Sequence, residues 1–229
     1  MILATNGIIQ SKAAAAPAGI VTANLQIYLQ ASNIVSYPGT GTAWNDISVN
    51  SRNFVINNTP IFETVGGVTG FRLNGTNQNM AGSFARIPTT NKSTFTFITV
   101  FKRNGSQGSE TKLMFASTSF GNSGLGITGT KLQWEWAGGD YNVDTGLVIP
   151  DNTWCFAALT VSATEVKVYL NSSVFTKAVS YPSGYFGGMW IASQNTVRYL
   201  LGSIGCAMVY DATLTPAEIS QNYIALGSL

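Results

Sequence analysis

The amino-acid sequence predicts an all-β protein that folds as a sandwich. Apolar residues recur with period two in short runs, and Gly, Pro, Asn and Ser separate one run from the next. Only 10% of the residues are charged, against about 25% in a typical soluble domain, so we expect a surface of hydroxyl and amide groups. A chain of 229 residues suits a single sandwich domain.

The strands are expected where apolar residues are most concentrated. These runs lie at 25–29, 71–73, 95–101, 112–115, 132–136, 154–161, 166–170, 189–192 and 204–210. The run 154–161 is apolar at both odd and even positions, which predicts a strand covered on both faces. The run 166–170 alternates apolar residues with Lys167 and Tyr169, which predicts a strand with one face in water.

A short helix is expected at 216–223, after the last strand. Thr215 can cap its N-terminus, and Pro216 fits the first helical position because no amide hydrogen bond is lost there. Glu218 completes a capping box with Thr215. We expect the helix to lie against the sandwich through Ile219 and Tyr223.

Residues 1–23 precede the first strand and are rich in alanine and aliphatic side chains. We interpret them as an N-terminal arm, and residues 24–229 as one domain without a repeat or linker. Lys12, the only cation of the arm, lies inside the apolar stretch rather than before it. This order is wrong for a secretory signal, so no signal peptide is expected.

The charge pattern and the lack of histidine exclude several classes of function. Twelve basic and 10 acidic residues give a net charge of +2 without a basic run, so nucleic acid is not an expected partner. No apolar stretch approaches the roughly 20 residues of a membrane helix. Without histidine, the chain lacks the commonest general base and metal ligand.

The two cysteines, Cys155 and Cys206, are too few for a zinc site or a disulfide scaffold. Each lies in an apolar run, where a buried thiol acts as a small hydrophobic group. A single bridge between them is the alternative, if their strands are adjacent and the compartment is oxidising.

Four groups of motifs, in order along the chain, resemble one known family. They lie at 25–33 with 36–48, at 71–77, at 151–161 with 166–171, and at 202–211 with 214–219. The first contains the segment 37–46, YPGTGTAWND. Over about residues 24–224 the chain resembles the laminin-G-like, concanavalin A-like lectin/glucanase family. This resemblance implies a two-sheet antiparallel jelly-roll sandwich that ends in a short C-terminal helix. The extended N-terminal arm lies outside the match.

The opening segment implies a setting as well. Members that carry this Tyr-Pro-Gly-x-Gly-x-x-Trp pattern look like virion proteins of tailed bacteriophages, including those that infect cyanobacteria. The resemblance therefore implies a non-catalytic structural protein of a virion, made in the host cytoplasm, which decorates or contacts the capsid and displays a lectin-like jelly roll. Its partners would be other virion subunits and further copies of itself, with a trimer as one arrangement.

The arm is the segment that we expect to anchor the protein to a partner subunit. Strand addition to an exposed sheet edge is one way for an apolar segment to bind a neighbouring chain. The anchoring side chains are expected to be Ile2, Leu3, Ile8, Ile9, Ile20 and Val21.

The alternative function is a carbohydrate-binding or host-attachment module that contacts cell-surface glycans. Trp134, Trp136 and Tyr141 could stack on sugar rings, and Asp140 and Asp144 could accept hydrogen bonds from hydroxyl groups. The same residues also fit a structural role, with at least one tryptophan in the core and a hairpin turn at 138–140.

Catalysis and metal binding are not expected. Glycoside hydrolysis, a remote alternative, needs two carboxylates about 5 to 10 Å apart, and the neighbours of Glu135 on its strand face, Gln133 and Ala137, are not acidic. No residue is therefore assigned a catalytic role. The family that the chain resembles often has Asp where Gln30 and Gln78 stand. Calcium sites include carboxylate ligands, so these amides argue against a calcium cofactor.

Overall fold

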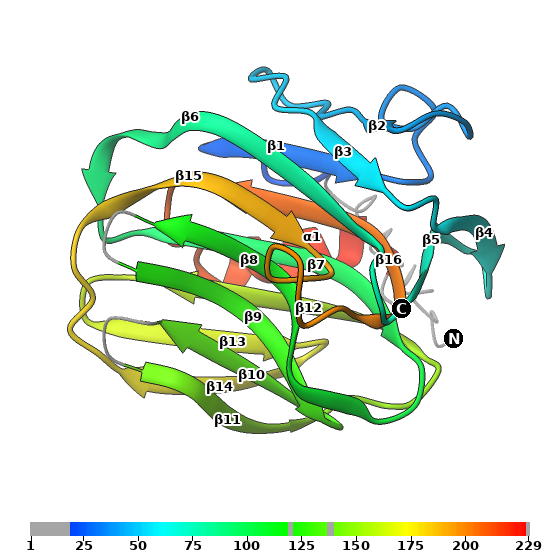
Figure 1. Ribbon diagram of the computed structural model, residues 1–229. Helices are drawn as coiled ribbons and strands as arrows, with labels where there is room; N and C mark the ends of the chain where they lie inside the picture. The colour runs from blue at the N-terminus through cyan, green and yellow to red at the C-terminus, as the bar shows by residue number, and fades with distance from the viewer. Residues whose placement is uncertain (1–18, 119–120, 137–139, 228–229) are drawn as a thin grey trace, which may run out of the picture.

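The computed structural model describes residues 19–118, 121–136 and 140–227, which form two packed sheets and one helix (Figure 1). Every strand pair among these residues is antiparallel, and each sheet has eight strands. The predicted two-sheet sandwich with a short C-terminal helix is therefore confirmed. None of the described helices is long and apolar enough to cross a membrane.

The first sheet is called sheet A. Its strands are β1 (Leu25–Gln30), β4 (Ile61–Val65), β5 (Val68–Asn74), β7 (Phe95–Arg103), β12 (Trp154–Val161), β13 (Glu165–Leu170), β14 (Ser173–Ala178) and β16 (Leu201–Tyr210). All of them except β4 and β14 coincide with strands that the sequence predicted. Their order is β14-β13-β12-β7-β16-β5-β4. β5 pairs with residues 201–204 of β16, and β1 pairs with the rest of that strand.

The second sheet, called sheet B, lies in front of sheet A in Figure 1. Its strands are β2 (Ala43–Trp44), β3 (Phe54–Asn57), β6 (Asn79–Lys92), β8 (Gln107–Thr118), β9 (Gly121–Gly129), β10 (Lys131–Trp136), β11 (Asp140–Val148) and β15 (Gly184–Ile191). Their order is β11-β10-β9-β8-β15-β6-β3-β2. One face of this sheet packs on sheet A, and the other face is the outer face of sheet B.

Strand pairing decides which side chains of sheet B enter the core. Met80, Ile191, Met114 and Leu125 are cross-strand neighbours in one row, and all are buried between the sheets. The adjacent row faces the other way because successive residues of a strand point to opposite faces. The outer face of sheet B therefore carries the row Val55, Ala81, Trp190, Phe115, Gly124 and Glu135.

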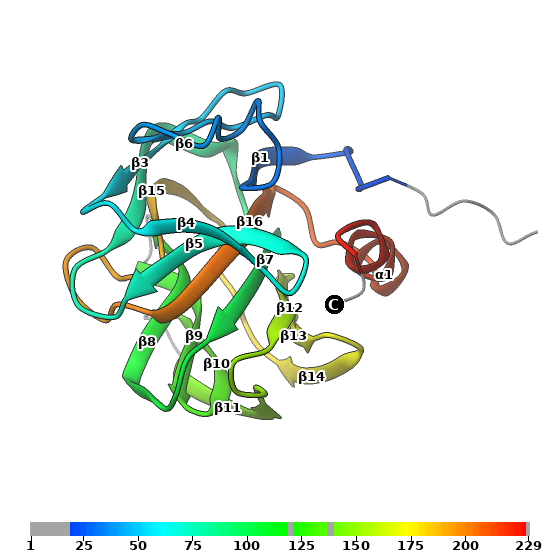
Figure 2. The same cartoon turned by 90° about the vertical axis from the view of Figure 1, so that its right-hand side faces the viewer.

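A second apolar layer covers the outer face of sheet A. The helix α1 (Pro216–Ala225) lies there, outside the sandwich (Figure 2). On β12, Cys155 and Leu159 face the core between the sheets, whereas Phe156 and Ala158 pack in the layer under α1. The prediction that this strand is covered on both faces is confirmed.

The helix begins as predicted and extends two residues further than expected. The Thr215 side chain accepts a hydrogen bond from the Glu218 amide at 3.3 Å, and the Glu218 carboxylate accepts one from the Thr215 amide at 2.8 Å. Ile219 and Tyr223 pack on sheet A as expected. Tyr169, expected to face water, is instead buried in this layer, because the helix reaches the outer face of β13.

The end of the N-terminal arm belongs to the domain. Val21 is buried, its amide donates to Asn222 Oδ1 at 2.8 Å, and its carbonyl accepts from the Tyr210 hydroxyl at 2.9 Å. Ile20 packs in the same layer. The assignment of Val21 to a partner is therefore not met, because Val21 is buried under its own helix, whereas Ile20 beside it is only partly buried. Ile2, Leu3, Ile8 and Ile9 lie outside the described residues.

The cysteines are free thiols on opposite faces of sheet A. Both are buried, with Cys155 on the core face of β12 and Cys206 on the outer face of β16. β7 lies between these two strands. The alternative of a Cys155–Cys206 bridge is therefore not met, because the strands are not adjacent and the thiols point apart.

Candidate functional site

A groove crosses the outer face of sheet B and has a volume of about 850 Å³. β3, β6, β15 and β8 contribute its side chains, because these strands are neighbours in the sheet. Its lining residues are Asn53, Val55, Asn57, Ala81, Gly82, Ser83, Ser117, Tyr185, Gly187, Gly188 and Trp190. We call this site the Trp190 groove.

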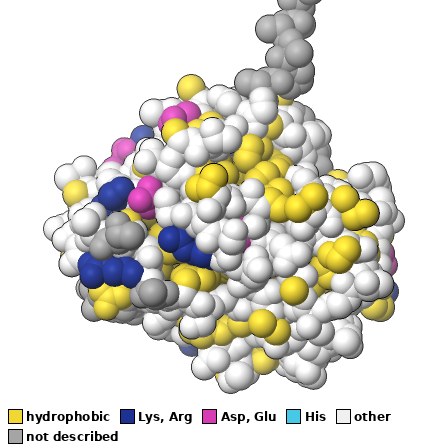
Figure 3. Space-filling view, turned by 90° about the horizontal axis from the view of Figure 1, so that it is seen from above, with side chains coloured by type: hydrophobic (Ala, Val, Ile, Leu, Met, Phe, Trp, Pro, Cys, Tyr) yellow, Lys and Arg dark blue, Asp and Glu magenta, His cyan; other side chains and the backbone are white. Residues whose placement is uncertain are grey.

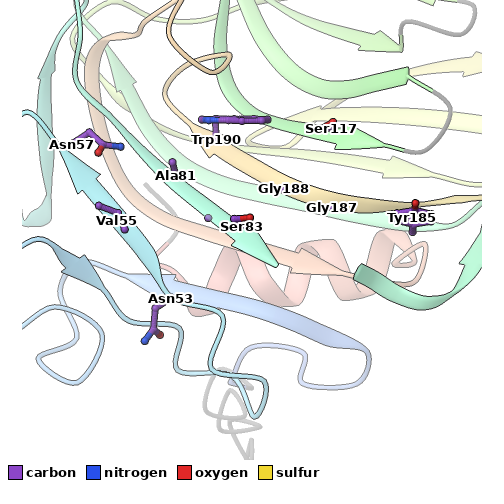
Figure 4. A pocket seen from close by; sticks show the side chains of 11 residues that line it. Asn53, Val55, Asn57, Ala81, Ser83, Ser117, Tyr185, Gly187, Gly188 and Trp190 are labelled. Atoms are coloured by element: carbon purple, nitrogen blue, oxygen red, sulfur yellow. The ribbon is translucent and has the colours of Figure 1, made fainter. Parts of the chain in front are cut away.

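Two aromatic residues of β15 stand at the ends of the groove floor. Figure 4 shows Trp190 and Tyr185 on the same strand with Gly187 and Gly188 between them. Both rings are half-buried. The Trp190 ring packs on Phe115 with ring centroids 6.2 Å apart, and the Arg86 guanidinium lies 4.2 Å from the centroid of the Tyr185 ring.

Small residues form the floor of the groove. Ser83, Gly188 and Ser117 are cross-strand neighbours. A Cβ at Gly187 would meet no atom within 4 Å, and a Cβ at Gly188 would come no closer than 3.5 Å to Gly82 O. These glycines are therefore not required by packing, and their effect is to leave space over the sheet, as glycine does where a ligand approaches a strand closely.

None of the described residues that line the Trp190 groove is charged. A second hollow, of about 420 Å³, lies on the β10–β11 side of the same sheet and has a different character. Its charged side chains are held in ion pairs, Lys131 with Asp144 at 2.7 Å and Glu110 with Arg198. Of these two sites, the Trp190 groove is the one that combines partly exposed aromatic rings with neutral hydroxyl and amide groups.

The surface seen from above in Figure 3 has few charged side chains, as the low content of charged residues in the sequence predicts. Most of it consists of uncharged polar side chains and backbone, with hydrophobic side chains in separate groups and few charged ones. Such a surface offers a partner many uncharged polar groups and few charges.

The aromatic platform that the sequence suggested does not form. Trp134 is fully buried and Trp136 is 8% exposed, and both belong to the core between the sheets. Asp144 is exposed, and Lys131 holds the pKa of its carboxyl below the ordinary value by a hydrogen bond. The side chains of Asp140 and Tyr141 lie outside the described ones. Trp134 and Trp136 cannot stack on a sugar because their strand face points to sheet A.

Glu135 points to the outer face but does not reach solvent. Its Oε2 accepts from Lys112 Nζ at 2.5 Å, and both side chains are buried. Burial lowers the pKa of the Lys112 ammonium, and the hydrogen bond to Glu135 opposes this. This carboxylate is therefore a member of an internal ion pair, and Gln133 beside it is an amide that accepts from the Thr128 hydroxyl at 2.6 Å.

Gln30 and Gln78 use their amides within the domain. Gln30 Oε1 accepts from the Tyr28 hydroxyl at 2.5 Å. Gln78 Oε1 accepts from the Asn74 amide, while its Nε2 donates to Asn58 O at 2.8 Å and Thr59 O at 3.1 Å. A carboxylate could not donate to these two carbonyl groups. In the part of the chain that the structure describes, no three His, Cys, Asp or Glu residues gather in a way that could hold a metal ion.

Sequence reasoning did not find the Trp190 groove. Tyr185 lies in the segment 181–188, where YPSGYFGG reads as turns broken by glycine, and Trp190 lies in the predicted strand at 189–192. A usable signal was present, since the aromatic residues Tyr185 and Trp190 flank a Gly-Gly pair. The sequence does not show that β15 sits in the middle of sheet B, and that position creates the site.

Solved structures with the same fold come from several carbohydrate-related proteins. The chain matches a Trypanosoma rangeli sialidase in complex with the inhibitor DANA, with a TM-score of 0.65 and 16% identity, covering 88% of this chain and 33% of that one. It also matches domain 4 of AbnA, a GH43 extracellular arabinanase of Geobacillus stearothermophilus in complex with arabinotriose. The TM-score is 0.63 and the sequence identity is 16%, and the match covers 87% of this chain and 98% of that one.

A third match is the binding domain of botulinum neurotoxin DC in complex with SialylT, with a TM-score of 0.63 and 11% identity, covering 91% of this chain and 52% of that one. At such identities the likeness shows the fold alone. The chain spans about a third of the length of the sialidase. No curated protein matches this chain.

A family model agrees with the fold and with the resemblance seen in the sequence. The model described as the concanavalin A-like lectin/glucanases superfamily matches residues 74–220, which is more than half of the chain. The chain therefore belongs to the concanavalin A-like lectin/glucanase superfamily.

Proposed function

We propose that the protein is a non-catalytic carbohydrate-binding module and that the Trp190 groove is its binding site. The observation that carries this proposal is the pair of half-buried rings, Trp190 and Tyr185, at the ends of a glycine floor with Ser83 and Ser117 beside it. Flat apolar ring faces combined with a few placed polar groups are what a binding site for a sugar needs, because each pyranose has an apolar face and a rim of hydroxyl groups.

The fold supports the same function by analogy. Domain 4 of the arabinanase was solved with arabinotriose, and the neurotoxin domain with SialylT. Sugar binding is thus compatible with this sandwich, although a fold by itself does not assign a function.

The lining of the groove favours binding without hydrolysis. Glycoside hydrolysis uses two carboxylates that flank the scissile bond, and none of the described residues that line the groove is Asp or Glu. Glu135, on the same sheet face, is committed to Lys112. We therefore propose that the module holds a glycan and leaves its bonds intact.

The experiment compares the wild-type protein with two groove variants on a glycan array. Trp190→Ala removes a stacking surface, and Gly187→Leu fills the floor at a position where added atoms meet no neighbour. We expect Trp190→Ala to reduce binding by about 5- to 150-fold, since stacking and apolar contact of one ring contribute on the order of 1 to 3 kcal/mol. We expect Gly187→Leu to reduce binding because its side chain occupies the space of the ligand. Gly108→Leu is the matched control, because a Cβ at Gly108 also meets nothing within 4 Å and Gly108 does not line the groove.

The wild-type protein should bind glycans on this array, and Gly108→Leu should bind equally well. Absence of any bound glycan, or binding that survives Gly187→Leu, would refute the groove as the site. Release of reducing sugar from a bound oligosaccharide would refute the non-catalytic part of the proposal.

A second proposal concerns where the module acts. We propose that it is displayed on a phage virion as a capsid-associated protein, anchored by residues 1–18 to a neighbouring subunit. The support is the resemblance of the segment 37–46 to virion proteins and the aliphatic composition of residues 1–18, of which only Lys12 is charged. Residues 19–23 are excluded from the anchor because Val21 is buried in its own domain.

Removing residues 1–18 separates anchoring from folding. The full chain should sediment as an oligomer, and the fragment 19–229 as a folded monomer that no longer assembles with its partner subunits. An unchanged sedimentation mass together with unchanged particle assembly would contradict the anchor.

A further inference from the structure

Two asparagine side chains at the β3 end of the Trp190 groove, Asn79 and Asn57, form a relay whose direction can be worked out. Asn79 is buried, and its Nδ2 donates to Asn195 O at 2.8 Å and to Ser193 Oγ at 2.7 Å. The orientation of an amide follows from its hydrogen-bond partners. A backbone carbonyl can only accept, so the group of Asn79 that faces Asn195 must be the NH₂, and its Oδ1 must lie on the other side.

The next member of the relay is therefore fixed too. Asn57 Nδ2 donates to Asn79 Oδ1 at 2.8 Å. A flipped Asn57 would bring two oxygen atoms together, which is unfavourable. With its NH₂ committed to Asn79, Asn57 has its Oδ1 left for a ligand in the groove.

Asn53, at the same side of the groove, has its amide held in the opposite orientation to that of Asn57. Its Oδ1 accepts from the Asp46 amide at 2.9 Å, so the group that it has left to offer is its NH₂. Asn53 and Asn57 flank Val55, and all three line the groove. This side of the groove thus carries an acceptor at Asn57 and a donor at Asn53, neither of which can exchange roles without breaking an internal hydrogen bond.

The groove has no charge to match the charge of a ligand. An anionic sugar would have to give up part of its hydration without an ion-pair partner among the described residues that line the site, and desolvating an unpaired charge is costly. Arg86 lies against the ring of Tyr185 and also contacts Asn91, and it is not part of the lining.

We propose that the Trp190 groove selects an uncharged saccharide, and that Asn57 determines specificity by accepting a hydrogen bond from one hydroxyl group of that saccharide. This inference rests on the proposed carbohydrate-binding function. Asn79 is a positioning residue, because it acts by holding the Asn57 amide in one orientation.

The test begins with a glycan array that carries neutral oligosaccharides together with their sialylated, sulfated and uronate-containing forms. Neutral forms should give the signals that Gly187→Leu abolishes. The neutral oligosaccharide with the strongest such signal is then titrated calorimetrically, together with its complete set of monodeoxy analogues, against wild-type protein, Asn57→Ala and Asn57→Ser. Asn50→Ala, an exposed asparagine outside the groove, is the matched control.

One monodeoxy analogue should bind wild-type protein about 5- to 10-fold more weakly, as expected for one hydrogen bond. Asn57→Ala should bind the parent sugar more weakly by a similar factor and should not distinguish that analogue from the parent. Such non-additivity identifies the pair that interacts, and a merely structural role of Asn57 would weaken all analogues alike. Asn57→Ser, which keeps an acceptor, should recover part of the discrimination.

Two results would overturn the inference while leaving carbohydrate binding intact. The first is acidic glycans binding the groove as tightly as their neutral forms, with loss in Gly187→Leu. The second is Asn57→Ala retaining wild-type affinity, or losing it equally for every analogue. If no glycan binds, or if no bound glycan is lost in Gly187→Leu, both the proposed function and this inference are refuted.

Discussion

Asp46 shows how one carboxylate can organise a long turn. Its Oδ1 accepts from the amides of Tyr28 and Ser48, each at 2.8 Å, and its Oδ2 accepts from the Ser48 hydroxyl and the Arg52 amide, also at 2.8 Å. Four donors converge on a side chain that is only 6% exposed. Asp46 therefore fastens the segment after β1 to the strand itself.

We expect Asp46→Asn to lower the free energy of unfolding by about 2 to 4 kcal/mol, because hydrogen bonds to a charged group are worth about 1.5 to 3 kcal/mol each. Whichever way the new amide turns, its NH₂ faces donors. Urea unfolding measures the change. Asp144→Asn is the control, since its exposed pair with Lys131 should contribute less than about 1 kcal/mol. Equal losses in the two variants would contradict the assigned role.

The same segment marks the limit of sequence reasoning at this scale. Trp44 and Tyr37 pack on Phe71 with ring centroids 4.9 and 4.8 Å away. A structural role for large aromatic residues in a turn can be predicted from sequence. The role of Asp46 cannot, because its donors are spread over 24 positions of sequence and only the fold brings them together.

Among the elements, α1 and the start of the chain stabilise each other. Val21, Tyr210 and Asn222 form a closed set of buried hydrogen bonds, completed by Asn222 Nδ2 donating to the Tyr210 hydroxyl at 3.2 Å. Asn222 is fully buried, so each of these polar groups depends on the others. Val21, which the sequence assigned to the arm, is therefore held by the domain through these hydrogen bonds.

Fragments 19–229 and 24–229 should differ sharply in stability. Loss of residues 19–23 removes the Val21 partners of Asn222 and Tyr210 and exposes apolar surface under α1, which should cost about 2 to 5 kcal/mol. Loss of residues 1–18 should leave this layer unchanged. Urea unfolding of the two fragments checks this, and equal midpoints would show that Val21 is not part of the domain.

Strand prediction succeeded for strands that are apolar on both faces and failed for β9, whose side chains are small. β7 and β12 were recognised because they are apolar on both faces. β9 was missed because Gly121–Gly129 reads as turns, yet a Cβ at Gly124 would lie 2.5 Å from Met114 O and one at Gly126 would lie 2.6 Å from Thr111 O. These glycines are required by the close approach of β8, which a sequence does not reveal.

For the whole molecule, alternation predicts two faces but not which face is buried. Trp134 and Trp190 both lie on strands of sheet B, one pointing to sheet A and the other to the groove. The alternation of residues in the sequence does not show which of the two tryptophans is buried and which lines a binding site. Their difference follows from the register of β15 between β8 and β6, a long-range property that decides the location of the candidate site.

Buried thiol and phenol groups in the outer layer of sheet A should make the folded protein less stable at alkaline pH. Burial raises the pKa of the Cys206 thiol above its ordinary 9.0, and burial is the main cause of the raised pKa values of the Tyr28 and Tyr210 hydroxyls, whose ordinary value is 10.0. In the folded state these groups keep protons that the unfolded chain has already lost. Their contribution to stability is therefore complete below pH 9.0 and is lost as the pH rises above it.

We expect the free energy of unfolding to fall by up to about 1.4 kcal/mol per pH unit for each such group above its ordinary pKa. Cys206→Ala and Tyr210→Phe should each make this fall less steep, because each removes one titrating group. Met208→Leu, on the same face of β16, should leave the slope unchanged. Urea unfolding between about pH 7 and pH 11 measures the slope over this window, and identical slopes in all four proteins would show that these buried groups do not control alkaline stability.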